Sequence, residues 1–390
     1  MKQNKRKNIA ILCTLLIVFT FASGCMENSS GSQDTTTTDQ NTDTITITDA
    51  LGRNVEVPRS PEYVICSGSG ALRYLTYLEA QDRIVAVDSI ETRESKYDAR
   101  PYALANPQFQ EYPVFGEFRG NDDPEKILTL DPRPQVIFKM YSASGYDPAE
   151  LQKKTGVPVI ALNYGDMANN RNDMDQALRI MGEVLGKEAR AEEVISFFDA
   201  AIADLNERTA NVPEENKTTC YVGGIARSGP HGFQSTEPTY PPFLFTNAKN
   251  VAYDSKNLST VEVSKESILG WDPDILFVDL STTQSEDQSS ALYQLQNDES
   301  YQQLTAVRSG EVYGVLPYNW YTQNQGSVLA DAYFAGKLLY PDRFGDVDLE
   351  NKTIDIYTFL VCKGDEELGR QVYDNMINAF SVPAFTKMDV

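Results

Sequence analysis

The chain repeats one short segment at two distant places. Residues 124–138 read PEKILTLDPRPQVIF, and residues 265–278 read KESILGWDPDILFV. Each segment has a glutamate, then Ile-Leu, then Asp-Pro, and it ends in an apolar run of the kind that forms a buried strand. The residue before a proline avoids helical angles, so Asp-Pro is expected to end a short helix and to start the strand. The repeat predicts two lobes of like construction.

Apolar runs alternate with helical patterns in both halves of the chain, which favours a mostly parallel α/β sheet in each lobe. Residues 44–58 alternate on both sides of a glycine turn and predict a hairpin. The other expected strands are residues 63–66, 84–87, 136–140, 157–162, 219–222, 275–279 and 312–315.

A long helical region is expected between the two lobes. Apolar residues follow helical spacing from Met174 to Leu185, and the pattern resumes after Gly186 as far as Leu205. We therefore expect an α/β protein whose lobes, residues 46–168 and 211–390, are joined by a nearly continuous helical region at 169–210. A linking helix is stiffer than a loop hinge, so lobe motion is expected to be small.

The N-terminus looks like an export signal. A basic start is followed by an apolar stretch over residues 9–22, which is shorter than the ~20 residues of a membrane span. Small residues then lead to Cys25, as in a lipobox, although Ala22 stands where leucine is preferred. We expect residues 1–24 to be a signal peptide, Cys25 to be lipidated, and residues 25–45 to form a polar tether on the outer face of the cytoplasmic membrane. A plain cleaved secretory signal is the alternative.

Composition argues against several classes of function. The formal net charge of −22 disfavours nucleic acid as a partner. The single histidine, His231, leaves a zinc site without its usual two or three imidazoles and a serine hydrolase triad without support. Cys66, Cys220 and Cys362 lie far apart, so we expect buried apolar thiols and no metal site.

Taken together, these segments resemble the periplasmic binding proteins for iron–siderophore complexes and cobalamin, the receptors of one class of ABC importers. The resemblance runs through residues 47–78, the two repeated segments, the linking helix and LADAYFAGKLLYPDRF at 329–344. It implies a monomeric, non-enzymatic receptor with no cofactor beyond a ligand that itself contains iron or cobalt. It also implies ABC permease and ATPase partners, with Glu125 and Glu266 as permease-docking residues. An acid in a first helical turn is also favoured by the helix dipole alone.

We expect a ligand cleft between the lobes, because ligands of open α/β sheets bind beyond the carboxyl ends of the strands. Each candidate in the first lobe follows a predicted strand or stands in a glycine-flanked loop. An ordinary glycine turn or a solvated surface side chain is the alternative in each case. The candidates are Ser67, Gly68, Ser69, Gly70, Arg119, Tyr141 and Tyr164.

The second lobe offers a glycine-rich loop and an aromatic loop. The candidates are Arg227, His231 and Gln234 in the first loop and Tyr318, Trp320 and Tyr321 in the second, with Asn319 and Gln323 as polar neighbours. Three large aromatic side chains in one loop predict a wall for a flat or bulky ligand.

The resulting hypothesis is a lipid-anchored receptor that delivers an iron complex of siderophore or haem type, or a corrinoid, to an ABC permease. One alternative keeps the fold and binds molybdate or tungstate through the loop at residues 67–71 with Arg119 and Arg227. A surface enzyme that uses His231 as its acid or base is a second alternative. A structural or adhesive surface protein is the third.

Overall fold

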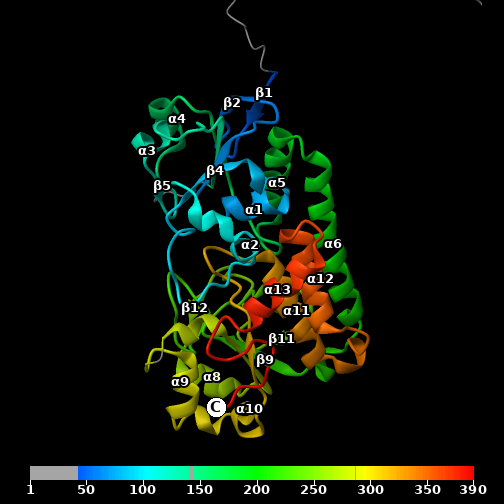
Figure 1. Cartoon of the computed structure of the whole chain (residues 1–390). Coiled ribbons are helices and arrows are strands. Elements are labelled where there is room, and N and C mark those ends of the chain that lie inside the picture. The colour runs from blue at the N-terminus through cyan, green and yellow to red at the C-terminus, as the bar shows by residue number, and fades with distance from the viewer. Residues whose placement is uncertain (1–42, 141–144, 286) are drawn as a thin grey trace, which may run out of the picture. The chain divides into compact units, whose positions relative to one another are not determined.

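The computed structural model describes residues 43–140, 145–285 and 287–390 (Figure 1). The expected signal peptide, Cys25, most of the tether and Tyr141 lie outside the described residues. The chain divides into the units Met1–Asn41 and Thr42–Val390, and all that follows concerns the second. Within the described ranges, no helix combines the length and the apolar character needed to cross a membrane.

The first lobe is built on a six-stranded sheet with the order β6-β5-β4-β3-β7-β8. All neighbouring strands are parallel except β6, which runs antiparallel to β5. The strands are β3 (Val64–Ser67), β4 (Ile84–Asp88), β5 (Val114–Glu117), β6 (Asn121–Asp122), β7 (Val136–Met140) and β8 (Val159–Leu162). The helices are α1 (Ala71–Tyr77), α2 (Pro101–Leu104), α3 (Pro124–Leu128) and α4 (Pro148–Thr155). The predicted hairpin is confirmed as β1 (Thr44–Thr48) and β2 (Asn54–Pro58).

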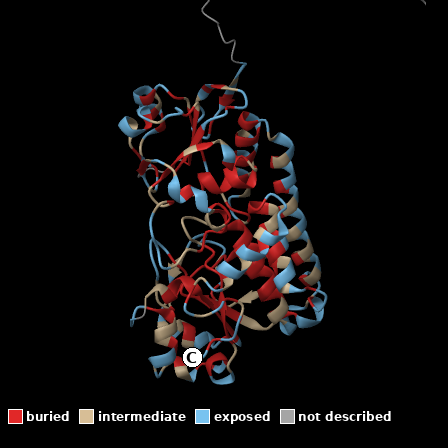
Figure 2. Ribbon diagram, in the orientation of Figure 1, coloured by how far each residue is buried: buried red, intermediate tan, exposed pale blue. Residues whose placement is uncertain are grey.

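The second lobe is built on a parallel sheet with the order β11-β9-β13-β14. Its strands are β9 (Thr219–Gly223), β11 (Lys249–Asn250), β13 (Ile275–Asp279) and β14 (Val312–Val315), beside an antiparallel pair, β10 (Ser235–Thr236) and β12 (Val261–Glu262). The helices are α7 (Pro241–Phe245), α8 (Lys265–Trp271), α9 (Ala291–Asn297), α10 (Thr305–Ser309) and α11 (Gln325–Leu339). Figure 2 shows the buried residues concentrated in both sheets and in the helices between them.

The sequence repeat becomes a structural repeat. In the first lobe α3 leads into β7, which pairs in parallel with β3, and in the second α8 leads into β13, which pairs in parallel with β9. Side chains cap both short helices, because Asp123 accepts from the backbone N–H of Glu125 at 3.0 Å and Ser264 accepts from that of Ser267 at 3.1 Å. The mixed α/β fold with two mostly parallel sheets is as predicted.

The linking region corrects one prediction. It consists of two helices, α5 (Arg171–Leu185) and α6 (Glu188–Thr209), and is not one nearly continuous helix. Gly186 adopts a left-handed φ of 65° and ends α5. Ion pairs from Arg171 to Asp199 at 2.8 Å and from Arg179 to Glu192 at 2.6 Å show that the helices pack antiparallel, side by side in Figure 1. Only α6 therefore runs on toward the second lobe.

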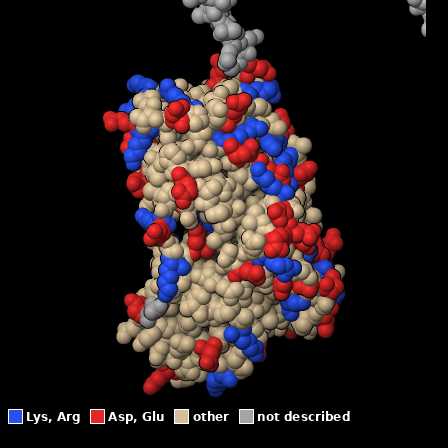
Figure 3. Space-filling view, viewed as in Figure 1, with Lys and Arg blue, Asp and Glu red and all other residues tan. Residues whose placement is uncertain are grey.

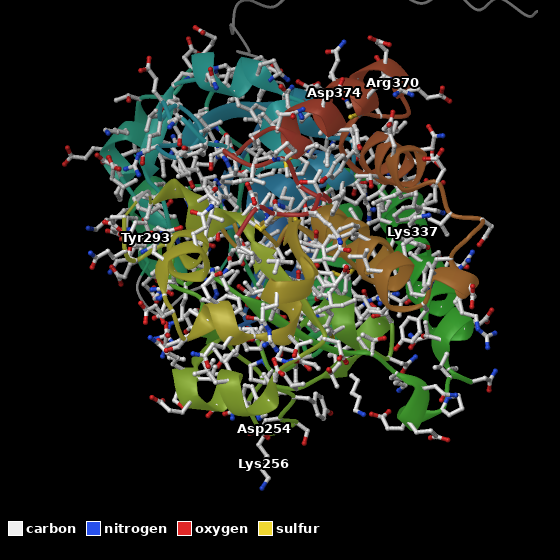
Figure 4. All side chains as sticks on the ribbon, turned by 90° about the horizontal axis from the view of Figure 1, so that it is seen from below. Asp254, Lys256, Tyr293, Lys337, Arg370 and Asp374 are labelled. Atoms are coloured by element: carbon white, nitrogen blue, oxygen red, sulfur yellow. The ribbon has the colours of Figure 1, made fainter. Side chains whose placement is uncertain are left out.

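Two C-terminal helices make a second connection between the lobes. α12 (Leu349–Val361) and α13 (Glu366–Ile377) fall within the range predicted for the second lobe, yet they pack against α1 and α2 of the first. Val372 and Met376 of α13 are buried, whereas Arg370 and Asp374 project outward (Figure 4). The first lobe thus receives part of its core from the last helices of the chain.

The three cysteines of the described residues are free and buried, as predicted. They are Cys66, Cys220 and Cys362. Burial raises the pKa of each thiol, to about 12 for Cys362, so they stay protonated and act as small apolar side chains.

Candidate ligand-binding site

A cavity of about 430 Å³ is lined by residues of both lobes. All the lining segments follow the carboxyl ends of strands or connect two strands, which is where loops gather in open α/β sheets. The lining residues of the first lobe are Ser69, Ile90, Phe118 and Arg119. Those of the second lobe are Ala226, Arg227, Ser228, Gly229, Gln284, Asn319, Trp320, Tyr321 and Thr322.

Five of the predicted ligand-binding residues are brought together here. They are Ser69, Arg119, Arg227, Trp320 and Tyr321. Asn319, which we expected as a polar neighbour, joins them and donates its side-chain amide to the Ala226 carbonyl at 3.2 Å. Contact between these residues and a ligand stays a prediction.

The cavity is cationic within an acidic protein. Its described lining residues include Arg119 and Arg227 and no carboxylate, although the chain carries a formal net charge of −22. Figure 3 shows acidic and basic side chains intermixed over the visible face. The guanidinium carbons of Arg119 and Arg93 each lie 5.1 Å from the centre of the Phe118 ring. Among the described residues, none of these three arginines forms an ion pair. Guanidinium groups placed in this way favour an anionic ligand.

Aromatic side chains form part of the wall. Trp320 packs edge to face against Phe380, with ring centres 5.5 Å apart. The Tyr321 hydroxyl donates to Asp88 Oδ2 at 2.6 Å and accepts from the Arg119 backbone N–H at 3.0 Å. Tyr321, from the second lobe, is thereby fixed to two segments of the first.

Three residues at or beside the cavity were not predicted from the sequence: Phe118, Arg93 and Asp88. Asp88 directly follows the predicted strand at residues 84–87, so the rule on strand ends would have pointed to it. Phe118 directly precedes the predicted residue Arg119, but β5, the strand before it, was not predicted. Burial, with a further contribution from Glu91, raises the pKa of Asp88 to about 7. Nothing in the sequence around Arg93 indicated its place beside Phe118.

The third aromatic residue of the predicted wall is a core residue. Tyr318 is 3% exposed, and its ring meets that of Tyr240 edge to face at 5.4 Å. Its hydroxyl donates to Glu237 Oε2 at 3.1 Å. Tyr318 follows β14 so closely that its side chain is still inside the lobe, and the wall consists of Trp320 and Tyr321 without it.

His231 and Gln234 brace their own loop and do not line the cavity. The Nε2 of His231 donates to the Arg227 carbonyl at 2.8 Å, and Nδ1 lies 3.1 Å from Glu262 Oε1. Gln234 donates its side-chain amide to the Val263 carbonyl at 2.9 Å. Because both ring nitrogens of His231 are engaged within the protein, the geometry gives no support to a role as acid or base.

The serine–glycine loop after β3 turns mainly inward. The buried Ser67 hydroxyl donates to Asp122 Oδ1 at 2.6 Å and accepts from Lys139 Nζ at 3.1 Å. Gly68 and Gly70 have φ of 85° and 90°, and a Cβ on Gly68 would lie 2.7 Å from the Met140 carbonyl oxygen. Ser69 is the one residue of the four that lines the cavity.

Tyr164 also lies outside the cavity lining and faces a separate hollow that includes Gln323. Its ring stacks on Tyr74 with centres 4.4 Å apart, and its hydroxyl donates to the Gln323 carbonyl at 2.7 Å. The residue therefore connects the lobes beside the cavity.

Gly70→Ala tests the close packing of this loop. A Cβ at Gly70 would lie 2.0 Å from Tyr164 Cε2, in addition to the left-handed φ. At Gly52, which shares a positive φ of 73°, the same Cβ meets nothing within 4 Å. We expect Gly52→Ala to lower the free energy of unfolding by ~1–2 kcal/mol and Gly70→Ala to lower it clearly more. Equal losses in urea unfolding would contradict the close contact.

The two glutamates proposed for docking, Glu125 and Glu266, are exposed in the first turns of α3 and α8. Their exposure is compatible with docking, and that role stays a prediction.

Within the described part of the chain, no group of three or more His, Cys, Asp or Glu side chains is placed to hold a metal ion.

The chain is similar to known proteins over most of its length. The family model for the periplasmic binding proteins matches residues 64–318. The molybdate-binding protein MolA of Haemophilus influenzae is 24% identical over 333 residues, which cover 80% of this chain and 89% of MolA.

Solved structures share the fold. MolA bound to molybdate has a TM-score of 0.62 at 22% identity, covering 81% of this chain and 98% of its own. A periplasmic solute-binding protein from Veillonella parvula has a TM-score of 0.63 at 21% identity, with coverage of 82% and 93%. The petrobactin-binding protein YclQ from Bacillus subtilis has a TM-score of 0.52 at 20% identity, with coverage of 77% and 99%. With a family model matching more than half of its residues and this two-lobed fold, the chain belongs to the periplasmic binding proteins.

Proposed function

We propose that this protein captures an anionic metal complex, of iron–siderophore or haem type, outside the cytoplasmic membrane and delivers it to an ABC permease. The observation that carries the proposal is the cavity between the lobes, which Arg119 and Arg227 line together with Trp320 and Tyr321, without a carboxylate among the described lining residues. Guanidinium groups bind carboxylate and other oxyanion groups in pairs of parallel hydrogen bonds. Aromatic rings supply flat apolar contact.

The size of the cavity favours a bulky ligand. Its volume of about 430 Å³ lies in the range of ~300–1,000 Å³ that is usual for small-molecule sites. A bare tetrahedral oxyanion would fill a small part of it. A corrinoid without negative charge would gain little from the arginines, so the charge favours ferric chelates and haem over corrinoids.

Molybdate or tungstate is the second candidate. Two observations favour it: the similarity to a molybdate-binding protein, and the presence of Arg119 and Arg227 in one cavity. On this alternative the two guanidinium groups hold the oxyanion and Trp320 contributes little.

Titration of Trp320 fluorescence separates the candidates. The chain has two tryptophans, so Trp271→Phe leaves Trp320 as the reporter. We expect saturable quenching by ferric tris-catecholate, ferric citrate or haem. Arg119→Ala and Arg227→Ala should each weaken that binding by about 10- to 100-fold, because a hydrogen bond to a charged group contributes ~1.5–3 kcal/mol.

The controls decide what a positive result means. Arg179→Ala removes an arginine whose partner is Glu192 on the next helix, and it should leave the affinity unchanged. Direct calorimetry of Trp320→Ala should show weaker binding of the bulky chelates. Saturation by molybdate or tungstate alone, insensitive to Trp320→Ala, would assign the protein to oxyanion uptake. Saturation by cobalamin alone would contradict an anionic ligand.

The remaining partners complete the proposal. A lipid on Cys25 would hold the receptor at the membrane through the tether, and Glu125 and Glu266 would each meet the permease from one lobe. Both glutamates stand at corresponding exposed positions of the repeated helices α3 and α8. The receptor would act as a monomer without catalysis, with the permease and its ATPase as partners.

A further inference from the structure

The loop after β14 supplies four cavity residues and has an unfavourable backbone. Asn319, Trp320, Tyr321 and Thr322 all line the cavity. Tyr321 and Thr322 have φ of 52° and 64°, a left-handed conformation that costs ~1–2 kcal/mol for a residue with a side chain. Two such residues in succession persist only where neighbouring groups hold them.

Arg73, on α1 of the first lobe, makes contacts that hold this loop. Its Nη1 donates to the Gln323 carbonyl at 2.8 Å. Its Nη2 donates to the carbonyls of Trp320 and Tyr321 at 3.1 and 3.2 Å. Arg73 is 1% exposed and does not line the cavity. One guanidinium of the first lobe therefore binds the backbone of the loop that forms the aromatic wall.

The hydrogen-bond partners of Arg73 are all uncharged groups. Among the described residues, no carboxylate forms an ion pair with it. Its Nη1 also donates to the Tyr164 hydroxyl at 2.7 Å, and the rings of Tyr102 and Tyr164 lie 5.1 and 5.8 Å from its guanidinium carbon. A buried charge is costly unless polar groups replace its water. The loop carbonyls do so here, and the guanidinium and the loop stabilise each other.

The geometry of the contacts requires an arginine. The planar guanidinium presents several donors in a fixed fork, which reaches three carbonyl groups and one hydroxyl at once. A lysine ammonium is a compact point charge and cannot reproduce that arrangement.

We propose that Arg73 is a positioning residue for ligand binding. It fixes the backbone of residues 320–323 from the opposite lobe and thereby sets where Trp320 and Tyr321 stand in the cavity. The inference rests on the proposed function in taking this cavity as the ligand site, and it is independent of which ligand is bound. The shape that the site accepts is then determined in part by a side chain that the ligand does not touch.

The test measures the environment of Trp320 in the loop before any ligand is added. In the Trp271→Phe background, Arg73→Gln should shift Trp320 emission to longer wavelength and raise its quenching by acrylamide, while far-ultraviolet circular dichroism stays native. Arg73→Lys should do the same. Affinity for ferric tris-catecholate or molybdate, whichever binds the parent protein, should fall by about tenfold or more, equivalent to 1.4 kcal/mol per tenfold.

Two further variants keep the proposal falsifiable. Arg83→Gln is the matched control, because Arg83 also donates to backbone carbonyls, those of Pro61 in the first lobe and of Leu185 at the end of α5, but to none in the loop. It should leave Trp320 emission unchanged, and the same shift in this variant would overturn the specific role of Arg73. If Arg73→Gln does not fold, Tyr164→Phe, which removes a hydroxyl bonded to both Arg73 and Gln323, should shift the emission in the same direction.

The outcomes also separate this proposal from the proposed function. Native Trp320 emission and quenching in folded Arg73→Gln would overturn the positioning role. A clear change in the loop, together with no binding of either probe by the parent protein, would support the positioning role and count against the proposed ligands.

Discussion

Lys139→Met is expected to lower the free energy of unfolding by about 3–5 kcal/mol, because it leaves the buried Asp122 carboxylate without its cation. The side chains of both residues are 1% exposed. Lys139 pairs with Asp122 and donates to the Gly120 carbonyl at 2.9 Å, so one ammonium serves both the carboxylate and the loop that carries Arg119. Urea unfolding at pH 7 measures the loss.

The pH dependence of this loss identifies its cause. Burial raises the pKa of Asp122, although Lys139 and Ser67 lower it in part, and removing Lys139 should raise it further. The cost of Lys139→Met should therefore be full at neutral pH and should shrink as the pH falls through that pKa, where Asp122 becomes neutral. The double variant Lys139→Met with Asp122→Leu should recover much of the stability. A loss that is independent of pH and of Asp122 would contradict the ion-pair explanation.

Stability should fall as the pH rises from about 4 to 7, by about 2 kcal/mol between pH 5 and 7 for each of two buried carboxyl groups. Burial raises the pKa of Asp279 to about 7, and burial with a contribution from Glu91 raises that of Asp88 to about 7. The ordinary value in an unfolded chain is ~3.9. Between these values the folded protein binds more protons than the unfolded chain. The stabilisation is therefore fully present below the unfolded value and is lost as the pH rises through the folded one.

Asp279→Asn should reduce the fall of the free energy of unfolding with rising pH. One carboxylate oxygen of Asp279 accepts from the Ser281 backbone N–H at 2.9 Å, whereas Oδ2 has no partner among the described residues. The free energy of unfolding of the variant, measured in urea from pH 5 to 8, should gain on that of the parent protein as the pH rises. Asp374→Asn, at an exposed position (Figure 4), is the control and should leave the slope unchanged. Parallel curves for Asp279→Asn would show that this group does not titrate in the window.

Strand positions were predictable where an apolar run is short and bounded. Residues 136–140, 275–279 and 312–315 form strands with the expected limits, because each run is long enough for a buried strand and too short for a helix. The linking region was predicted less well. Apolar spacing is helical on both sides of Gly186, and spacing does not report that a left-handed glycine reverses the direction of the chain.

The loops that form the candidate site were predictable, but only some of the side chains that line it were. Arg119 and Arg227 lie in loops that leave strand ends and do line the cavity, whereas Ser67 and Tyr318, equally near strand ends, turn into the core. The sequence of a loop does not report the direction of each side chain. The role of Arg73 was not predictable for another reason. An arginine in a short helix suggests a solvated face. Its contacts with residues 320–323 join positions that are nearly 250 residues apart in the sequence.

The return of α12 and α13 to the first lobe has a consequence for how the protein matures. These are the last two helices of the chain, and they cover α1 and α2. During synthesis the first lobe is made early, but its apolar surface over α1 and α2 stays uncovered until the final helices of the chain have been made. We therefore expect neither lobe to be obtained as a stable separate fragment, and C-terminal truncation should damage the lobe that is translated first.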